Sequence, residues 1–123
     1  MQSPHDLITI AYAAFNRRDI DAVLALMRPD VDWPNGMDGT RVHGRDKVRD
    51  YWTRQWATID PRVDPVSIKQ DERDNTIVEV HQVVRDLDGK LLVDQIVQHV
   101  YVIRDGLIVR MDIQTPGEKP MTT

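Results

Sequence analysis

The sequence predicts an α+β fold in which three helices precede a mostly antiparallel sheet. Apolar residues recur at helical spacing up to about residue 59, and at the spacing of extended chain from residue 62 onward. Two Asp-Gly pairs, Asp88-Gly89 and Asp105-Gly106, separate the later segments as hairpin turns, because both residue types tolerate positive φ. Helices followed by a strand meander are typical of the α+β class. We expect one domain, residues 1–115, followed by a flexible polar tail, residues 116–123.

The first half of the chain predicts three helices. Ser3 and Pro4 are suited to open the first helix, Asp19 to cap the second, and the third begins near Arg45. Asp60-Pro61 ends the third helix. The apolar stripes of the three helices are Ile8, Ala11, Tyr12 and Phe15; Ile20, Val23, Leu24 and Met27; and Val48, Tyr51, Trp52, Trp56 and Ile59.

The strands are predicted mainly in the second half. A short strand at 31–33 precedes a Pro- and Gly-containing loop at 34–39. Pro65 places the strand at 63–70 on a sheet edge, because proline cannot donate to a strand ladder. Three longer strands follow at 76–85, 91–104 and 107–115.

The two hairpins predict which residues share a sheet face. Pairing Leu87 with Lys90 and Arg104 with Leu107 gives two faces, and neither is polar enough to face solvent. Three helices can cover only one of them, so we expect the other to meet a second copy in a homodimer. One face carries Glu79, His81, Val83, Asp94, Ile96, Gln98, Val100, Val109, Met111 and Ile113; the other carries Val78, Val80, Gln82, Val84, Val93, Gln95, Val97, His99, Tyr101, Ile103, Ile108, Arg110 and Asp112.

Composition excludes several functional classes. Twenty acidic against sixteen basic residues give a net charge of −4, so no nucleic-acid partner is expected. The absence of cysteine excludes disulfides, thiolate metal sites and a cysteine nucleophile. The apolar stretch 8–15 has neither the basic flank of a signal peptide nor the length of a membrane span. We therefore expect a cytoplasmic protein without a membrane partner.

Four segments resemble the nuclear transport factor-like superfamily, which includes ketosteroid isomerase and the SnoaL-like polyketide cyclases. They are Tyr12–Asp21, Met27–Gly36, His43–Trp52 and Arg104–Asp112, and the resemblance spans nearly the whole chain. It implies a cone-shaped, strongly curved sheet packed against the helices around a pocket for a small hydrophobic molecule. Members of the superfamily include isomerases, cyclases, dehydratases and plain binding domains.

The catalytic positions of ketosteroid isomerase are not retained. The positions of its tyrosine, its general base and its protonated aspartate correspond to Ala11, Trp33 and Gln98. Trp33 cannot act as a base, so that exact activity is not expected. Gln98, or Tyr12 one place from the tyrosine position, could still donate a hydrogen bond to a ligand oxygen.

The same correspondence directs Glu79, His81, Asp94 and Gln98 into the cone and predicts two catalytic candidates. The first is His81, which carboxylates could tune as a general acid or base; the alternative is a core histidine satisfied by a neighbour. The second is Asp112, opposite His99 on the predicted register, because SnoaL-like cyclases resemble this chain in carrying an inward aspartate on the last hairpin. On our register this pair faces the dimer side instead.

The remaining ligand-binding candidates are aromatic. Trp33, Trp52 and Trp56 could stack on a flat ligand, with ordinary core packing as the alternative. Glu79, His81 and Asp94 could also form a metal triad, but their spacing is generic, so neither a metal nor a cofactor is predicted.

The sequence thus predicts a cofactor-independent cyclase, isomerase or dehydratase that acts on a small hydrophobic carbonyl compound by proton transfer. Two alternatives stay open, a domain that binds a small hydrophobic ligand without chemistry and a purely structural dimerisation domain.

Overall fold

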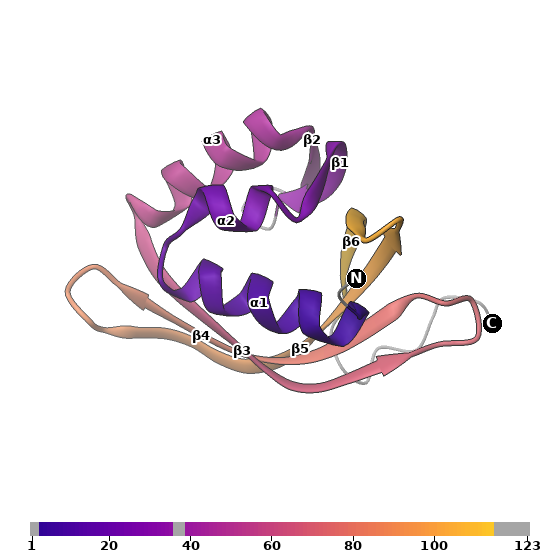
Figure 1. Cartoon of the computed structure of the whole chain (residues 1–123). Coiled ribbons are helices and arrows are strands. Elements are labelled where there is room, and N and C mark those ends of the chain that lie inside the picture. Colours follow the sequence, from indigo (N-terminus) through magenta and orange to yellow (C-terminus); the bar gives the residue numbers. More distant parts are fainter. Residues whose placement is uncertain (1–2, 36–38, 115–123) are drawn as a thin grey trace.

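The computed structural model describes residues 3–35 and 39–114, which form three helices and six strands (Figure 1). The α+β prediction is confirmed. The predicted tail, residues 116–123, lies outside the described residues. The helices are α1 (Pro4–Asn16), α2 (Ile20–Leu24) and α3 (Arg45–Trp56), and the strands are β1 (Met27–Asn35), β2 (Thr40–His43), β3 (Ile59–Gln70), β4 (Thr76–Asp86), β5 (Leu91–Arg104) and β6 (Leu107–Gln114).

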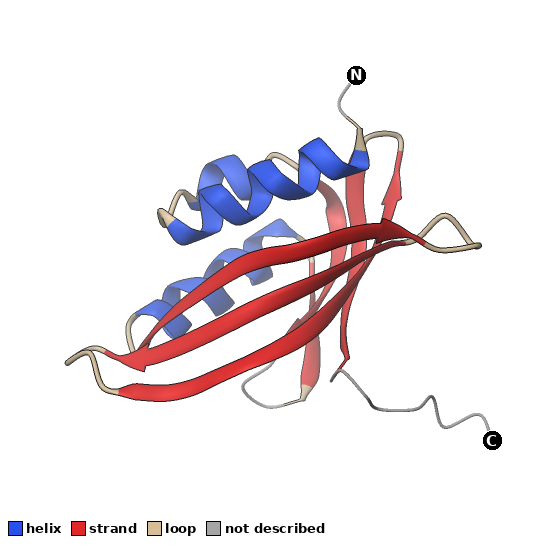
Figure 2. Cartoon of the chain, turned by 90° about the horizontal axis from the view of Figure 1, so that it is seen from below, coloured by secondary structure: helices blue, strands red, loops and turns tan. Residues whose placement is uncertain are grey.

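The six strands form one curved, open sheet in the order β2-β1-β6-β5-β4-β3. Neighbouring strands are antiparallel except β1 and β6, which run parallel, so the sheet is mixed. The three helices lie on one side of it, and Figure 2 views the molecule from the side that no helix covers. As Pro65 predicts, β3 is an edge strand. No helix among the described residues is long and apolar enough to cross a membrane.

The helix starts follow the predicted caps. The Ser3 side chain accepts a hydrogen bond from the backbone N–H of Asp6 at 3.2 Å, and Pro4 lies in the first turn. The Asp19 carboxylate accepts from the N–H of Ala22, also at 3.2 Å. The helix α2 is shorter than its apolar stripe suggests, because the chain becomes extended at Met27 and β1 begins there. The short strand β2 was not predicted.

The covered face of the sheet is the reverse of the one expected. On β4 and β5 the residues buried on the side of the helices are Thr76, Val78, Val80, Val84, Val97, His99 and Tyr101. The physical reason is apolarity, since this face carries most of the valines of the two strands, whereas the opposite face carries Glu79, His81 and Asp94. Burying valine and tyrosine releases more apolar area from water than burying a charged face would.

The register between β4 and β5 is as predicted over most of its length, with Glu79 opposite Gln98 and Val84 opposite Val93. Asp105 and Gly106 form the predicted turn, with φ of 55° and 77°. Beyond this turn a β-bulge at Val109 shifts the register.

The bulge makes the predicted pairing of His99 with Asp112 wrong. Ile103 lies opposite Ile108, but Val102 lies opposite Arg110, so Val109 is the additional residue. His99 faces Ile113 across the ladder, and Asp112 pairs with Val100. Asp112 therefore lies on the face away from the helices.

Candidate functional site

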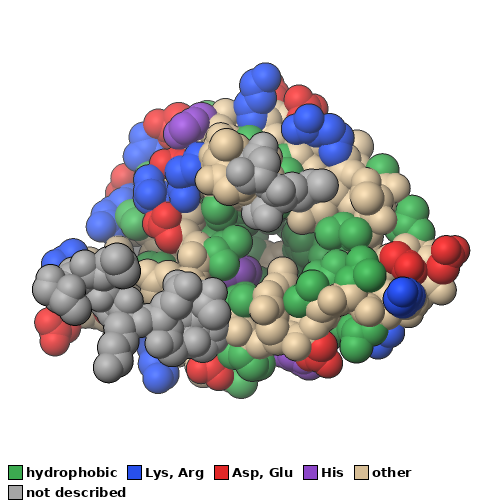
Figure 3. Space-filling view, turned by 180° about the vertical axis from the view of Figure 1, so that it is seen from behind, with side chains coloured by type: hydrophobic (Ala, Val, Ile, Leu, Met, Phe, Trp, Pro, Cys, Tyr) green, Lys and Arg blue, Asp and Glu red, His purple; other side chains and the backbone are tan. Residues whose placement is uncertain are grey.

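A cavity lies between the helices and the covered face of the sheet. It contains about 680 Å³ of space free of protein atoms, part of it continuous with solvent. Figure 3 shows one face of the molecule hollowed, with hydrophobic side chains gathered around the hollow. Most of the lining is aromatic or aliphatic, which suits a small apolar molecule. The lining residues with polar atoms are Tyr12, Trp33, Tyr51, Trp52, Gln55, Gln82, His99 and Tyr101.

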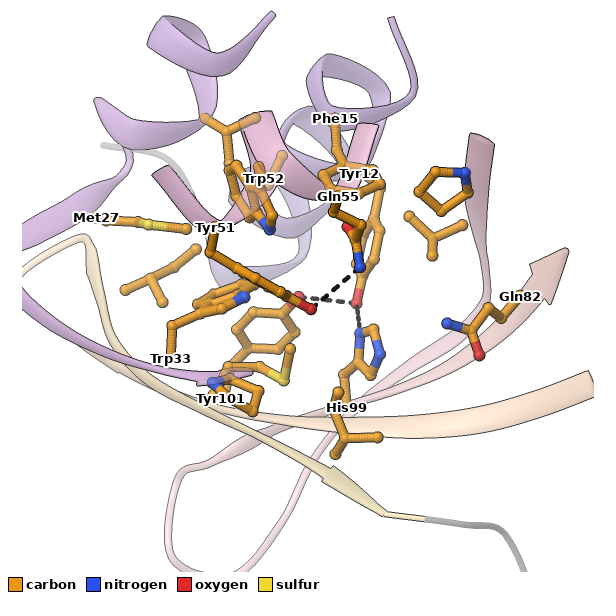
Figure 4. Close-up of a pocket in the computed structure, with 18 residues that line it drawn as sticks. Tyr12, Phe15, Met27, Trp33, Tyr51, Trp52, Gln55, Gln82, His99 and Tyr101 are labelled. Carbon is orange, nitrogen blue, oxygen red and sulfur yellow. Dashed lines mark hydrogen bonds between the residues drawn. The ribbon is translucent and has the colours of Figure 1, made fainter. Parts of the chain in front are cut away.

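Three of these side chains form a buried hydrogen-bonded chain (Figure 4). Tyr101 on β5 donates its hydroxyl hydrogen to the Tyr12 hydroxyl oxygen on α1 at 2.8 Å. The Tyr12 oxygen lies 2.6 Å from Nδ1 of His99, also on β5. Because Tyr12 accepts from Tyr101, its own hydrogen is free to be donated to Nδ1.

This arrangement favours one tautomer of His99, in which Nδ1 accepts the hydrogen of the Tyr12 hydroxyl. With Nδ1 accepting, the neutral imidazole carries its hydrogen on Nε2. No described residue pairs with Nε2, and His99 is only 7% exposed and lines the cavity. Burial lowers the pKa of His99 from 6.5 to about 4, so the ring is uncharged at neutral pH. The cavity therefore contains a neutral N–H donor that is open to a ligand.

The two tyrosines of this hydrogen-bonded chain, Tyr12 and Tyr101, remain protonated. Burial raises the pKa of the Tyr12 hydroxyl well above its usual value of 10.0, and the neighbouring Tyr101 raises it further. Burial also raises the pKa of Tyr101. Both hydroxyls therefore act as neutral donors rather than as phenolates.

Aromatic rings build the wall beside this chain. Trp33 on β1 meets Trp52 on α3 edge to face, with centroids 5.5 Å apart and an interplanar angle of 89°. Trp52 also meets the Phe15 ring edge to face at 5.2 Å. Edge-to-face packing holds aromatic rings firmly, so the wall is preorganised.

The cavity residues of the described chain include no Asp, Glu, Lys or Arg. Two glutamines supply further polar groups. Gln55 donates to the Tyr51 hydroxyl at 3.1 Å, and Gln82 accepts from the Gln95 amide at 2.8 Å. The chemistry available to these residues is that of a neutral imidazole, phenols and amides. Nor do three metal-ligating side chains gather anywhere in residues 3–35 and 39–114.

Four of the predicted site residues line the cavity, namely Tyr12, Trp33, Trp52 and His99. Trp56 does not line it, but stacks on Trp52 at 5.9 Å and packs under the guanidinium of Arg18. For Trp56 the alternative of ordinary packing is the better description.

The prediction that His81 faces the cavity is wrong. His81, Glu79, Asp94 and Gln98 lie on the face of β4 and β5 opposite to the buried valines, outside the cavity lining. His81 Nε2 is paired there with the Asp94 carboxylate at 2.7 Å, and both side chains are about half exposed. The strand alternation was read correctly, but the wrong face was assigned to the helices.

Asp112 is likewise outside the cavity, in an ion-pair network on β1, β2 and β6. Arg110 contacts its carboxylate at 2.8 Å and Arg41 contacts it at 3.0 Å. The same two arginines also bind Asp32, at 2.6 and 2.5 Å, and these contacts lower the pKa of Asp32. Because two arginines bind its carboxylate oxygens, Asp112 has a structural role in this network.

The sequence did not predict Tyr101, Tyr51, Gln55 and Gln82 as cavity residues. One signal was available for two of them, because Gln82 and Tyr101 share the valine-rich strand face with His99. Tyr51 and Gln55 lie one turn apart on α3, a spacing that places both side chains on one helix face.

The comparisons with known proteins identify the family. A family model described as SnoaL-like domain matches residues 9–111, and the chain belongs to that family. No curated protein matches the chain.

Solved structures agree with this assignment. A structure of TerC co-crystallized with polyporic acid is 26% identical to this chain, covers 90% of it and 89% of TerC, and has a TM-score of 0.79. An NTF2-like protein of unknown function from Burkholderia pseudomallei is also 26% identical, with 94% and 92% covered and a TM-score of 0.80. A candidate polyketide cyclase from Sinorhizobium meliloti is 22% identical, with 89% and 94% covered and a TM-score of 0.74, and shows the same fold.

Proposed function

We propose that this protein binds a small, flat, mainly apolar compound in the cavity and promotes proton transfer next to an oxygen of that compound, without a cofactor. Reactions of this kind include cyclisation, isomerisation and dehydration. The observation that carries the proposal is His99, a buried neutral imidazole whose Nδ1 is bound by Tyr12 and whose Nε2 has no partner among the described residues.

The role of His99 is to bind a carbonyl oxygen. The Nε2 hydrogen bond becomes stronger as negative charge develops on that oxygen, because the surrounding cavity is aromatic and poor in competing dipoles. A C–H bond next to the carbonyl becomes more acidic as a result. Since no carboxylate occurs among the described lining residues, the proton would pass to a base from solution, hydroxide or a buffer anion, while His99 binds the oxygen.

A relative supports the class of ligand. TerC, with which this chain shares 26% identity over about nine-tenths of both chains, was crystallised with polyporic acid. This makes polyporic acid a suitable first ligand for binding experiments on this chain.

Hydrogen exchange on a cyclic ketone tests the proposal. We would follow deuterium incorporation next to the carbonyl of 2-tetralone in D2O by proton NMR, for the wild type and the variants His99→Gln, Tyr12→Phe and His81→Ala. The wild type should accelerate exchange, and Tyr12→Phe and His99→Gln should each lower the rate at least about tenfold. His81→Ala should leave it unchanged, because that side chain lies on the outer face.

The opposite pattern, with exchange dependent on His81 and independent of His99, would reject the site proposed here. A wild type that does not accelerate exchange of any ketone it binds would reject catalysis.

Binding without chemistry is the second candidate function. It is favoured by the absence of a carboxylate base among the described cavity residues. Titration calorimetry with polyporic acid measures binding, and mass spectrometry of the released compound distinguishes the two functions, because a pure binding domain releases its ligand unchanged.

A further inference from the structure

The cavity contains a second polar position that the proposed function does not use. It is Gln82 on β4, a half-buried lining residue whose Oε1 accepts a hydrogen bond from Gln95. A glutamine amide has a donor end and an acceptor end. No described residue pairs with the other end of the Gln82 amide, so it is available to a ligand.

The strand register separates Gln82 from His99. His99 lies opposite Val78, and Gln82 lies four residues further along β4 on the same face. Since each strand residue advances the chain by about 3.3 Å, this offset corresponds to about 13 Å along β4. Figure 4 shows both side chains at the same cavity.

The cavity lining beside Gln82 is apolar. Gln82 lies opposite Val63 of β3, and both Val63 and Pro61 of that strand line the cavity. Val80 and Val97, at the intermediate position between the two polar residues on the sheet, are buried and do not line it. A flat hydrocarbon framework fits this apolar lining, and an oxygen at each end fits the two polar groups.

We propose that Gln82 is a specificity-determining residue that binds a second oxygen of the ligand, at the end away from His99. The ligand class is a flat compound of at least two fused rings with a hydroxyl or carbonyl oxygen at both ends. This inference rests on the proposed function for the oxygen at His99. A ligand with a single oxygen would displace water from the Gln82 amide without replacing its hydrogen bond, and would bind more weakly.

Two ligands of the same shape test the inference. We would measure by titration calorimetry the dissociation constants of 2-naphthol and of naphthalene-2,6-diol for the wild-type protein and for Gln82→Met. The wild type should bind the diol about tenfold more tightly than 2-naphthol. Gln82→Met, which keeps the length of the side chain and removes the amide, should abolish the preference for the diol and bind 2-naphthol at least as tightly as the wild type does, because no amide is then left without a hydrogen bond.

Gln95→Met is the matched control. It removes the same Gln82–Gln95 hydrogen bond but leaves the Gln82 amide in the cavity, and Gln95 does not line the cavity. The control should keep the preference for the diol. The melting temperature of each variant verifies that it is folded.

The outcomes separate this inference from the proposed function. If the wild type binds both ligands equally, or if Gln82→Met retains the preference, the role of Gln82 is overturned while binding at His99 stands. If neither ligand binds to the wild type, both proposals are overturned.

Discussion

At the scale of single residues, the buried chain of Tyr101, Tyr12 and His99 combines structural and chemical roles. Tyr12 is its middle member, with one hydrogen bond on each side. The sequence indicated Tyr12 and His99 as ligand-binding residues from their place in the pattern. It could not show that they contact each other, because 87 positions separate them and only the packing of α1 on β5 brings them together.

We predict that Tyr12→Phe lowers the free energy of unfolding by about 1–3 kcal/mol, since it leaves a buried imidazole nitrogen without a donor and the Tyr101 hydroxyl without an acceptor. Tyr101→Phe removes only the end of the chain, so its cost should be smaller, about 0.5–1.5 kcal/mol. Urea unfolding followed by circular dichroism measures both. Equal losses in the two variants would contradict the order of donors described here.

The burial of His99 predicts an acid-sensitive fold. In the unfolded chain this histidine takes up a proton below about pH 6.5, whereas in the folded protein it does so only near pH 4. Protonation therefore favours unfolding, and stability should fall by up to about 3 kcal/mol as the pH is lowered from 6.5 to 4, with no further loss from this group below pH 4.

The unfolding free energy of His99→Gln, measured across this pH range, should depend on pH less than that of the wild type. The variant His81→Gln should keep the wild-type dependence, because it does not touch the buried chain. An unchanged dependence in His99→Gln would show that other groups cause the acid sensitivity.

At the scale of elements, the bulge at Val109 determines which residues of β6 face the helices. It places Met111 on the inner side with Ile108, and it leaves Arg110 and Asp112 in the outer ion-pair network. A turn type can be predicted from Asp-Gly, and the β4–β5 register followed from it. The bulge has no comparable signal, because no glycine or proline occurs between Leu107 and Gln114. The pairing of Asp112 therefore could not be derived.

Deleting Val109 should remove the bulge and make β6 a regular strand in which Ile108 and Arg110 are neighbours, so Met111 stays on the inner side and Arg110 and Asp112 stay outside. We expect the deletion to cost about 0.5–3 kcal/mol, because only the local twist changes. Val109→Ala keeps the number of residues in the strand and should cost about 1 kcal/mol or less. Urea denaturation measures both, and complete loss of cooperative unfolding in the deletion variant would show that the bulge is required for the fold.

At the scale of the whole molecule, the sheet is covered on one side only. The order of helices and strands was enough to predict this layering. Which face the helices cover depends on how much apolar area each face can bury, and strand alternation alone does not give that. On the uncovered side Ile96 is 39% exposed beside the half-exposed Val83, and Nε2 of His81 is hydrogen-bonded to the Asp94 carboxylate within the sheet. A second copy can cover these two apolar side chains without leaving the Asp94 carboxylate unpaired.

We propose that this outer face associates with a second copy of the chain. Ile96→Arg should convert the dimer to a monomer in light scattering coupled to size-exclusion chromatography. The control Leu87→Arg introduces the same charge at a more exposed residue, 62%, in the turn between β4 and β5, and should remain dimeric. A wild type that is monomeric at tens of micromolar would reject the proposal.

The tryptophans of the aromatic wall also make ligand binding measurable by intrinsic fluorescence. All three tryptophans of the sequence belong to one cluster, in which Trp33 and Trp52 border the cavity while Trp56 lies behind Trp52. A compound entering the cavity changes the surroundings of two of the three indoles at once, so their emission should shift or be quenched as the site fills. Occupancy can therefore be read from unlabelled protein, and Trp56→Phe would remove background emission without removing either indole at the cavity.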